Sequence, residues 1–207
     1  MKSLRLDELE GIPVFGTLVW KPVRRELGVT AFGINAYTAA DAGGEVVEDH
    51  DESTLGHEEL YVVVAGRALF TVDGVEVDAP TGTLLFLDDP TQRRHAIATE
   101  PGTTVLAIGG VPGVHEISAW EYVFPAAPHV RAGDYETAKA IIGSGLEQRP
   151  GHPSLLYHLA CVESLAGERD AALTHLNAAV AAAERFRDYA QAEEDFAAIR
   201  DDPRFPE

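Results

Sequence analysis

The feature that most constrains the fold is a change in sequence pattern near Trp120. Before this residue, short runs of β-branched and aromatic residues alternate with glycine, proline and aspartate. Many short strands separated by turn residues favour an antiparallel sandwich or barrel over a parallel α/β sheet. The tetrapeptide Val72-Asp73-Gly74-Val75 predicts a two-residue hairpin turn, because aspartate and glycine tolerate the positive φ that such turns require. The clearest strand-like runs are residues 28–37, 60–64, 67–72, 83–87 and 103–108.

After Trp120 the sequence is rich in alanine and leucine at helical spacing. The prolines in the segment 124–128 predict a linker there, and Pro150 is expected to end one helical unit. Small and apolar residues recur with a period of 34, which predicts antiparallel helices that approach closely. The sequence therefore predicts an α+β protein with a β-rich domain at 1–122 and a helical domain at 128–207. The recurring pairs are Gly133 and Gly167, Ala138 and Ala172, and Ile142 and Leu176.

This period resembles the tetratricopeptide repeat. The unit before the best match keeps its second helix, at 134–146, but has prolines where its first helix would run. Residues 189–200 are expected to form a capping helix. About one and a half repeats are too few to be stable alone, so we expect the helices to pack on the β-rich domain or on a second copy of the chain. The best match rests on Leu159, Ala160, Gly167, Ala172, Leu176 and Ala179.

Composition limits the partners. The chain has 34 acidic and 16 basic residues, a formal net charge of −18, which repels phosphate backbones and anionic lipids. We therefore expect no nucleic acid and no membrane partner. The single cysteine, Cys161, excludes an intramolecular disulfide and is expected to be buried and inert. Without a signal-peptide pattern or an apolar run of roughly 20 residues, the sequence predicts a cytoplasmic protein.

Residues that could carry chemistry gather between Gly44 and Gly66. Because alternate residues of a strand share a face, His57, Glu59 and Tyr61 are expected to point the same way. The same argument places His50 and Glu52 on one face. In a second stretch, 80–95, His95 shares a face with Arg93 and Ile97.

These two stretches resemble the motifs of the cupin family. Gly44 and His50 keep the opening spacing of the family's first motif, Glu59 and Gly66 keep its closing spacing, and Gly82 and His95 fit its second motif. The resemblance covers about residues 30–110. It implies a small antiparallel β-barrel of the jelly-roll type, in which histidines and a glutamate converge and hold a divalent metal.

The chain departs from the family at the paired histidines, whose positions hold Ser53 and Leu55. The resemblance then implies a metal site of His50, His57, Glu59 and His95. Imidazoles with a carboxylate suit iron, manganese, nickel or zinc. The alternative is a chain that keeps the fold without a metal and leaves His57 and its neighbouring glutamates solvated.

For a small acidic ligand, Arg93 is the expected recognition residue, with Tyr61 and Glu52 beside it, because guanidinium groups bind carboxylates. A surface salt bridge is the alternative role of Arg93. The sequence assigns no catalytic residue.

Three functions remain open. The first is an enzyme or binding protein that takes a small molecule in the barrel. The second is a regulatory homodimer, in which the barrel is the scaffold and the helical repeats dock a protein partner. The third is a scaffold without chemistry, because a fold alone does not decide function.

Overall fold

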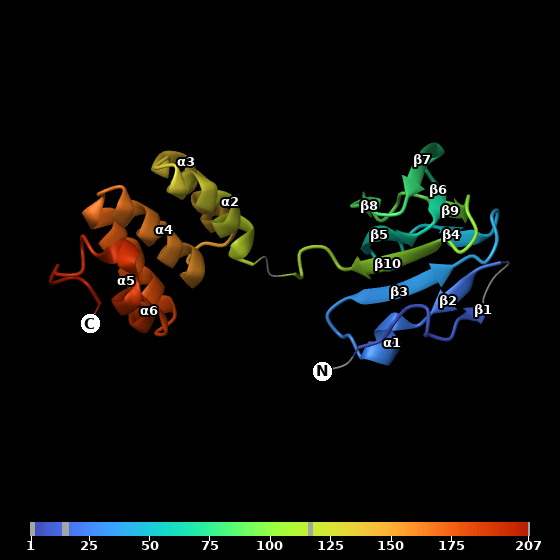
Figure 1. The fold of residues 1–207 in the computed structure, drawn as a ribbon, viewed down its shortest axis with the longest axis horizontal. Helices are drawn as coiled ribbons and strands as arrows, with labels where there is room; N and C mark the ends of the chain where they lie inside the picture. The colour runs from blue at the N-terminus through green and yellow to red at the C-terminus, as the bar shows by residue number, and fades with distance from the viewer. Residues whose placement is uncertain (1–2, 14–16, 116–117, 207) are drawn as a thin grey trace. The chain divides into compact units, whose positions relative to one another are not determined.

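The computed structural model describes residues 3–13, 17–115 and 118–206 (Figure 1). The chain divides into two compact units, Met1–His115 and Glu116–Glu207. Among the described residues, the first unit contains the strands and one short helix, α1 (Val23–Leu27), and the second contains helices α2 to α6. The expected α+β composition, with antiparallel sheets followed by helices, is confirmed.

The strands of the first unit form two sheets in which every neighbouring pair is antiparallel. The six-stranded sheet has the order β1 (Ile12–Pro13), β2 (Val19–Lys21), β3 (Gly33–Thr38), β10 (Thr104–Gly110), β5 (Glu58–Ala65), β8 (Leu84–Leu87). The four-stranded sheet has the order β4 (Glu45–His50), β9 (Arg94–Ala98), β6 (Arg67–Val72), β7 (Val75–Pro80).

The two sheets share one hydrophobic core. Val63 of β5 and Val105 of β10 face it from the larger sheet, and Ala96 of β9 faces it from the smaller one. The rings of Tyr61 and Phe70 meet across the core with centroids 5.5 Å apart. Alternate residues of β5, β6 and β9 fill this core, as expected for facing antiparallel sheets.

The predicted hairpin turn is confirmed. Strands β6 and β7 pair directly, with Val72 opposite Val75. Asp73 has φ of 47° and Gly74 has φ of 82°, the positive values that a two-residue hairpin demands.

The second unit consists of α2 (Trp120–Arg131), α3 (Tyr135–Gln148), α4 (Pro153–Leu165), α5 (Arg169–Ala182) and α6 (Phe186–Ala192), followed by a 3₁₀ turn at Glu194–Phe196. Short connections join each of the helices α2, α3 and α4 to the next one, so consecutive helices lie side by side and antiparallel (Figure 1). Small side chains, among them Ala138, Ala160 and Ala172, are fully buried where these helices pack. Cys161 is buried in α4, and burial raises the pKa of its thiol, as expected for an inert cysteine.

Two predictions for this unit are wrong. The segment 124–128 is not a linker, because α2 continues through Pro125 and Pro128. Both prolines are exposed, so water can solvate the carbonyls that lose an amide partner, while buried Ala126 packs against the next helices. The capping helix expected at 189–200 is not continuous, because only residues 189–192 of that segment belong to an α-helix and only Glu194–Phe196 form a 3₁₀ turn. Helix α6 ends at Ala192, because Glu193 is extended and its side chain accepts a hydrogen bond from the amide of Asp195.

No helix among the described residues is both long and apolar enough to cross a lipid bilayer.

Candidate functional site

Three side chains with metal-binding atoms converge between the sheets: His50, Glu52 and Glu59, here called the His50 cluster. His50 is the last residue of β4, Glu52 lies two residues beyond it, and Glu59 is the second residue of β5. His50 Nε2 lies 3.7 Å from Glu52 Oε1 and 3.8 Å from Glu59 Oε2. One ligand atom from each residue lies within 4.8 Å of the other two, so one ion can be shared among them.

The backbone fixes Glu52 in the loop between β4 and β5. Its amide donates a hydrogen bond of 2.8 Å to the carbonyl of Pro90, and its own carbonyl accepts one of 2.7 Å from the amide of Gly56. Gly56 has φ of 67°, which closes the loop in a conformation that favours glycine. The loop therefore presents Glu52 toward His50 although it belongs to no strand.

His50 is oriented by a backbone contact. Its Nδ1 lies 2.8 Å from the carbonyl oxygen of Glu48, so Nδ1 donates and Nε2 is directed to the carboxylates. The Glu59 carboxylate raises the pKa of His50 above its ordinary value, although partial burial opposes this. The cluster therefore stabilises a positive charge between the ring and the carboxylates.

Glu59 is the most heavily contacted carboxylate of the cluster. The Tyr61 hydroxyl donates a hydrogen bond to Glu59 Oε2, and Arg94 Nη2 lies 3.1 Å from the same oxygen. Burial alone raises the pKa of Glu59, but His50, Tyr61 and Arg94 outweigh burial and leave this pKa below its ordinary value. Burial, followed by the charge of Glu59, raises the pKa of Tyr61. Glu59 is therefore a carboxylate, and Tyr61 remains its hydrogen-bond donor.

Arg94 places a permanent positive charge in this region, and its side chain is 0% exposed. Its Nη1 donates a hydrogen bond of 2.8 Å to the carbonyl of Gln92. Nη2 is close to Glu59 but not aligned for a hydrogen bond, and neither Nε nor Nη2 has a hydrogen-bond partner within the described ranges. The contact is therefore an ion pair that neutralises Glu59 without satisfying the whole guanidinium.

The structure brings only some of the sequence-predicted residues together. His57 Nδ1 lies 3.7 Å from Glu52 Oε2, so His57 flanks the cluster, and Tyr61 belongs to it through Glu59. His95 does not reach the cluster. Its Nε2 lies 3.7 Å from Glu45 Oε1, and Arg93 pairs with Asp49 at 2.7 Å.

The strand alternation explains why His95 and Arg93 are excluded. In β9, Arg94, Ala96 and Ala98 are buried, whereas His95 and Ile97 are partly exposed on the opposite face. His95 and Arg93 do share a face, as predicted, but that face is turned away from the core. Together with Glu45, Asp49, Thr71, Asp73 and Gly74, they line a hollow of about 700 Å³ on the outside of the smaller sheet.

Two further residues beside the cluster were not among the residues assigned to the site from the sequence. Arg94 is one. Tyr37 of β3 is the other: burial, followed by the charges of Glu48, Glu59 and Glu52, raises its pKa. Ala96 and Ala98 were the available signal for Arg94, because small residues at alternate positions mark the crowded face of a strand.

The donor set of the His50 cluster fits a divalent transition metal. One imidazole nitrogen and two carboxylates are donors that iron, manganese and zinc accept in proteins. Each donor is held by a further contact: His50 by the Glu48 carbonyl, Glu52 by His57, and Glu59 by Tyr61. The charge of Arg94 would work against a dication at Glu59.

No family model matches the chain, and no curated protein matches it significantly. Among solved structures, a cupin protein from Bacteroides fragilis is 22% identical, with a TM-score of 0.40, over 54% of this chain and 91% of that one. A sugar phosphate isomerase from a cupin superfamily, from Silicibacter pomeroyi, is 18% identical, with a TM-score of 0.43, over 52% and 74%. A predicted oxalate decarboxylase from Thermotoga maritima is 16% identical, with a TM-score of 0.43, over 53% and 99%.

Proposed function

We propose that the first unit binds a divalent transition metal through His50, Glu52 and Glu59. The observation that carries this proposal is the convergence of three ligand atoms within 4.8 Å of one another between the two sheets. The proposal agrees with the cupin resemblance of the sequence, but the ligand set differs from the expected one. Glu52 takes part, His57 supports Glu52 from the side, and His95 lies outside.

The protein residues divide the work at this site. The Glu48 carbonyl holds His50 with Nε2 toward the carboxylates. Tyr61 and Arg94 hold Glu59 in its ionised state at low dielectric. A bound divalent ion would supply Lewis acidity and an attachment point for a small acidic ligand. Such a ligand would depend on that ion, because Arg93 lies on the other face of β9 and Arg94 is fully buried.

Metal content and calorimetric titration of the metal-free protein with Zn²⁺ and Mn²⁺ test the proposal. We expect one ion per chain, lost in His50→Ala and in Glu59→Gln and retained in His95→Ala. His95→Ala is the matched control, because His95 is also a partly exposed histidine beside a glutamate, on the outer face of the same sheet. Absence of binding in the wild type, or loss confined to His95→Ala, would exclude the site.

We also propose that the first unit is a dimerising scaffold, because the outer face of its larger sheet is apolar. Leu84 and Phe86 of β8 are 66% and 54% exposed. They stand directly opposite Val62 and Leu60 of β5, on the face turned away from the core. Apolar patches of this kind mark interaction sites. A second copy of the chain suits this patch, because molecules that each carry a net charge of −18 approach best through an uncharged face.

A further inference from the structure

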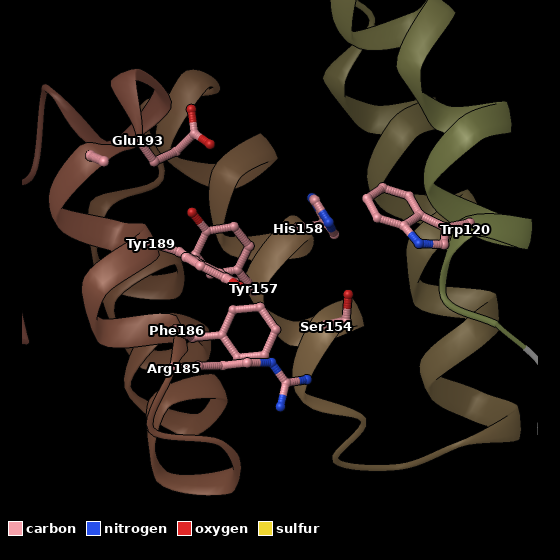
Figure 2. Close-up of a pocket in the computed structure, with 9 residues that line it drawn as sticks. Trp120, Ser154, Tyr157, His158, Arg185, Phe186, Tyr189 and Glu193 are labelled. Carbon is pink, nitrogen blue, oxygen red and sulfur yellow. The ribbon is translucent and has the colours of Figure 1, made fainter.

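The second unit contains a pocket of about 510 Å³ between α2, α4 and α6 (Figure 2). The size is that of a typical ligand site. We propose that this pocket, here called the aromatic groove, binds an extended peptide segment that carries an apolar or aromatic residue between one acidic and one basic residue. The proposal concerns only residues of the second unit and does not depend on the metal site. It gives a location and a chemistry to the protein partner expected for the helical repeats.

The walls of the aromatic groove are rings that are already held in place. Trp120 stacks on Phe124 with centroids 5.0 Å apart and contacts the ring of His158 at 5.5 Å. On the other side, Phe186 packs against Tyr157 at 4.9 Å. Figure 2 shows Trp120 facing the α6 residues across His158. Insertion of a ligand side chain would cost the protein little conformational entropy, because the walls of the groove are already ordered.

Two of the aromatic residues that line the groove are largely exposed to solvent. Trp120 is 49% exposed and Tyr189 is 54% exposed. Large aromatic side chains contribute most of the binding energy in protein interfaces, together with arginine. Their exposure on one groove therefore favours an apolar or aromatic residue of a partner as the central anchor.

Among the residues that line the aromatic groove, the charged ones, Arg185 and Glu193, flank α6 at its two ends. Burial lowers the pKa of His158, so the middle of the groove is neutral at pH 7. Arg185 precedes α6, and Glu193 follows it. Arg185 lies over the Phe186 ring at 4.9 Å and has no ion pair with any residue of the described chain. A ligand that complements the groove needs an acidic group near Arg185 and a basic group near Glu193.

The separation of these charges sets the spacing in the ligand. Helix geometry places residues eight positions apart at about 12 Å along the axis, from a rise of about 1.5 Å per residue. An extended peptide covers about 3.3–3.6 Å per residue. The acidic and basic residues of the ligand should therefore be three or four positions apart, with the apolar anchor between them. The open groove admits such a segment, whereas a lone Arg185 in an acidic chain does not favour nucleic acid.

Fluorescence anisotropy with the full chain and a panel of labelled synthetic peptides tests the proposal. The panel holds peptides with phenylalanine between glutamate and lysine at spacings of two to six, in both orders, and peptides with two glutamates or two lysines. We expect the mixed-charge peptides with a spacing of three or four to bind most tightly, and Trp120→Ala to weaken them. Equal or tighter binding of the two-lysine peptide would overturn the proposal, because it would show attraction to the net charge alone.

A charge exchange removes the remaining ambiguity. Arg185→Glu should weaken binding of the best mixed-charge peptide by about tenfold or more and favour the peptide in which lysine replaces the glutamate. Arg131→Glu is the matched control, since Arg131 is another exposed arginine of this unit that does not line the groove. Far-UV circular dichroism checks that the helices persist. Failure of every peptide to bind, or equal effects of the two substitutions, would overturn the proposal.

Discussion

Arg94 is the first residue of β9 and Arg93 directly precedes it, and their side chains lie on opposite sides of the sheet. Replacing each with methionine compares the effect of a buried arginine with that of an exposed one. The Arg94 side chain is 0% exposed and lies 3.1 Å from Glu59, whereas the Arg93 side chain is 62% exposed and pairs with Asp49. Methionine keeps a flexible, apolar stem without the charge and the N–H donors of arginine. The pair of variants therefore tests whether Arg94 is the built-in counter-charge of Glu59.

The expected loss of stability in Arg94→Met follows from two opposing effects. An ion pair at 3.1 Å with an effective dielectric constant of about 20 has an attraction of about 5 kcal/mol. Against it, burying Nε and Nη2 without hydrogen bonds costs about 1–3 kcal/mol for each, or about 3 kcal/mol for the two together in the lower half of that range. The difference gives a net loss of about 2 kcal/mol in the free energy of unfolding of the metal-free protein. Arg93→Met should cost less than about 0.5 kcal/mol, as exposed pairs do.

Metal affinity should change in the opposite direction. Removing a positive charge beside Glu59 favours a dication there, and we expect Arg94→Met to bind Zn²⁺ at least about tenfold more tightly than the wild type, which corresponds to about 1.4 kcal/mol. Native-state hydrogen exchange of β5 and β9 amides with chelator present measures the stability of this unit alone, and calorimetry measures the affinity. Equal costs for both variants, or weaker zinc binding by Arg94→Met, would refute this account of Arg94.

Three further predictions concern other parts of the chain. Gly66→Ala should lower the free energy of unfolding by about 2–4 kcal/mol, because a Cβ there would lie 2.4 Å from the side-chain oxygen of Thr103. Gly56→Ala has nearly the same φ but open space around it, and it should lower the free energy of unfolding by about 1 kcal/mol. Chemical denaturation compares the two variants, and equal losses would contradict the steric argument. Glu163 raises the pKa of His175, so the protonated ring stabilises the fold fully below about pH 6.5, and this stabilisation is lost as the pH rises through the folded-state pKa. NMR titration should show a lower pKa of His175 in Glu163→Gln than in the wild type. An unchanged pKa would argue against the pair. Phe86→Glu should convert a dimer to a monomer in sedimentation equilibrium, and a wild type that is monomeric throughout would exclude the outer patch as an interface.

The sequence was most informative where local chemistry decides the structure. The Asp73-Gly74 turn was predictable, since its backbone angles follow from the two residue types. Helix α3 was predictable as well: Asp134, at its expected start, caps it by accepting a hydrogen bond from the amide of Thr137. Helix α2 was not predictable, because packing of Ala126 overrides the local effect of its prolines.

The candidate site shows the same division. His50, Glu52 and Glu59 could be named from the sequence, but which of them would meet depended on the loop between β4 and β5. Alternation placed His95 and Arg93 on one face of a strand without saying which face is buried. Ala96 and Ala98 are small enough for the crowded interior, and Arg94 is buried as well because alternate residues of a strand share a face. The resemblance to the cupin motifs instead implied that His95 faces the interior, which is the opposite of its observed position.

Anomalous diffraction from crystals grown with Zn²⁺ would locate the metal directly. The account predicts one anomalous peak per chain, about 2.0–2.2 Å from His50 Nε2 and from an oxygen of Glu59, with Glu52 as a further ligand. A peak bound by His95 and Glu45 on the outer face of the smaller sheet, or no peak at the His50 cluster, would contradict it.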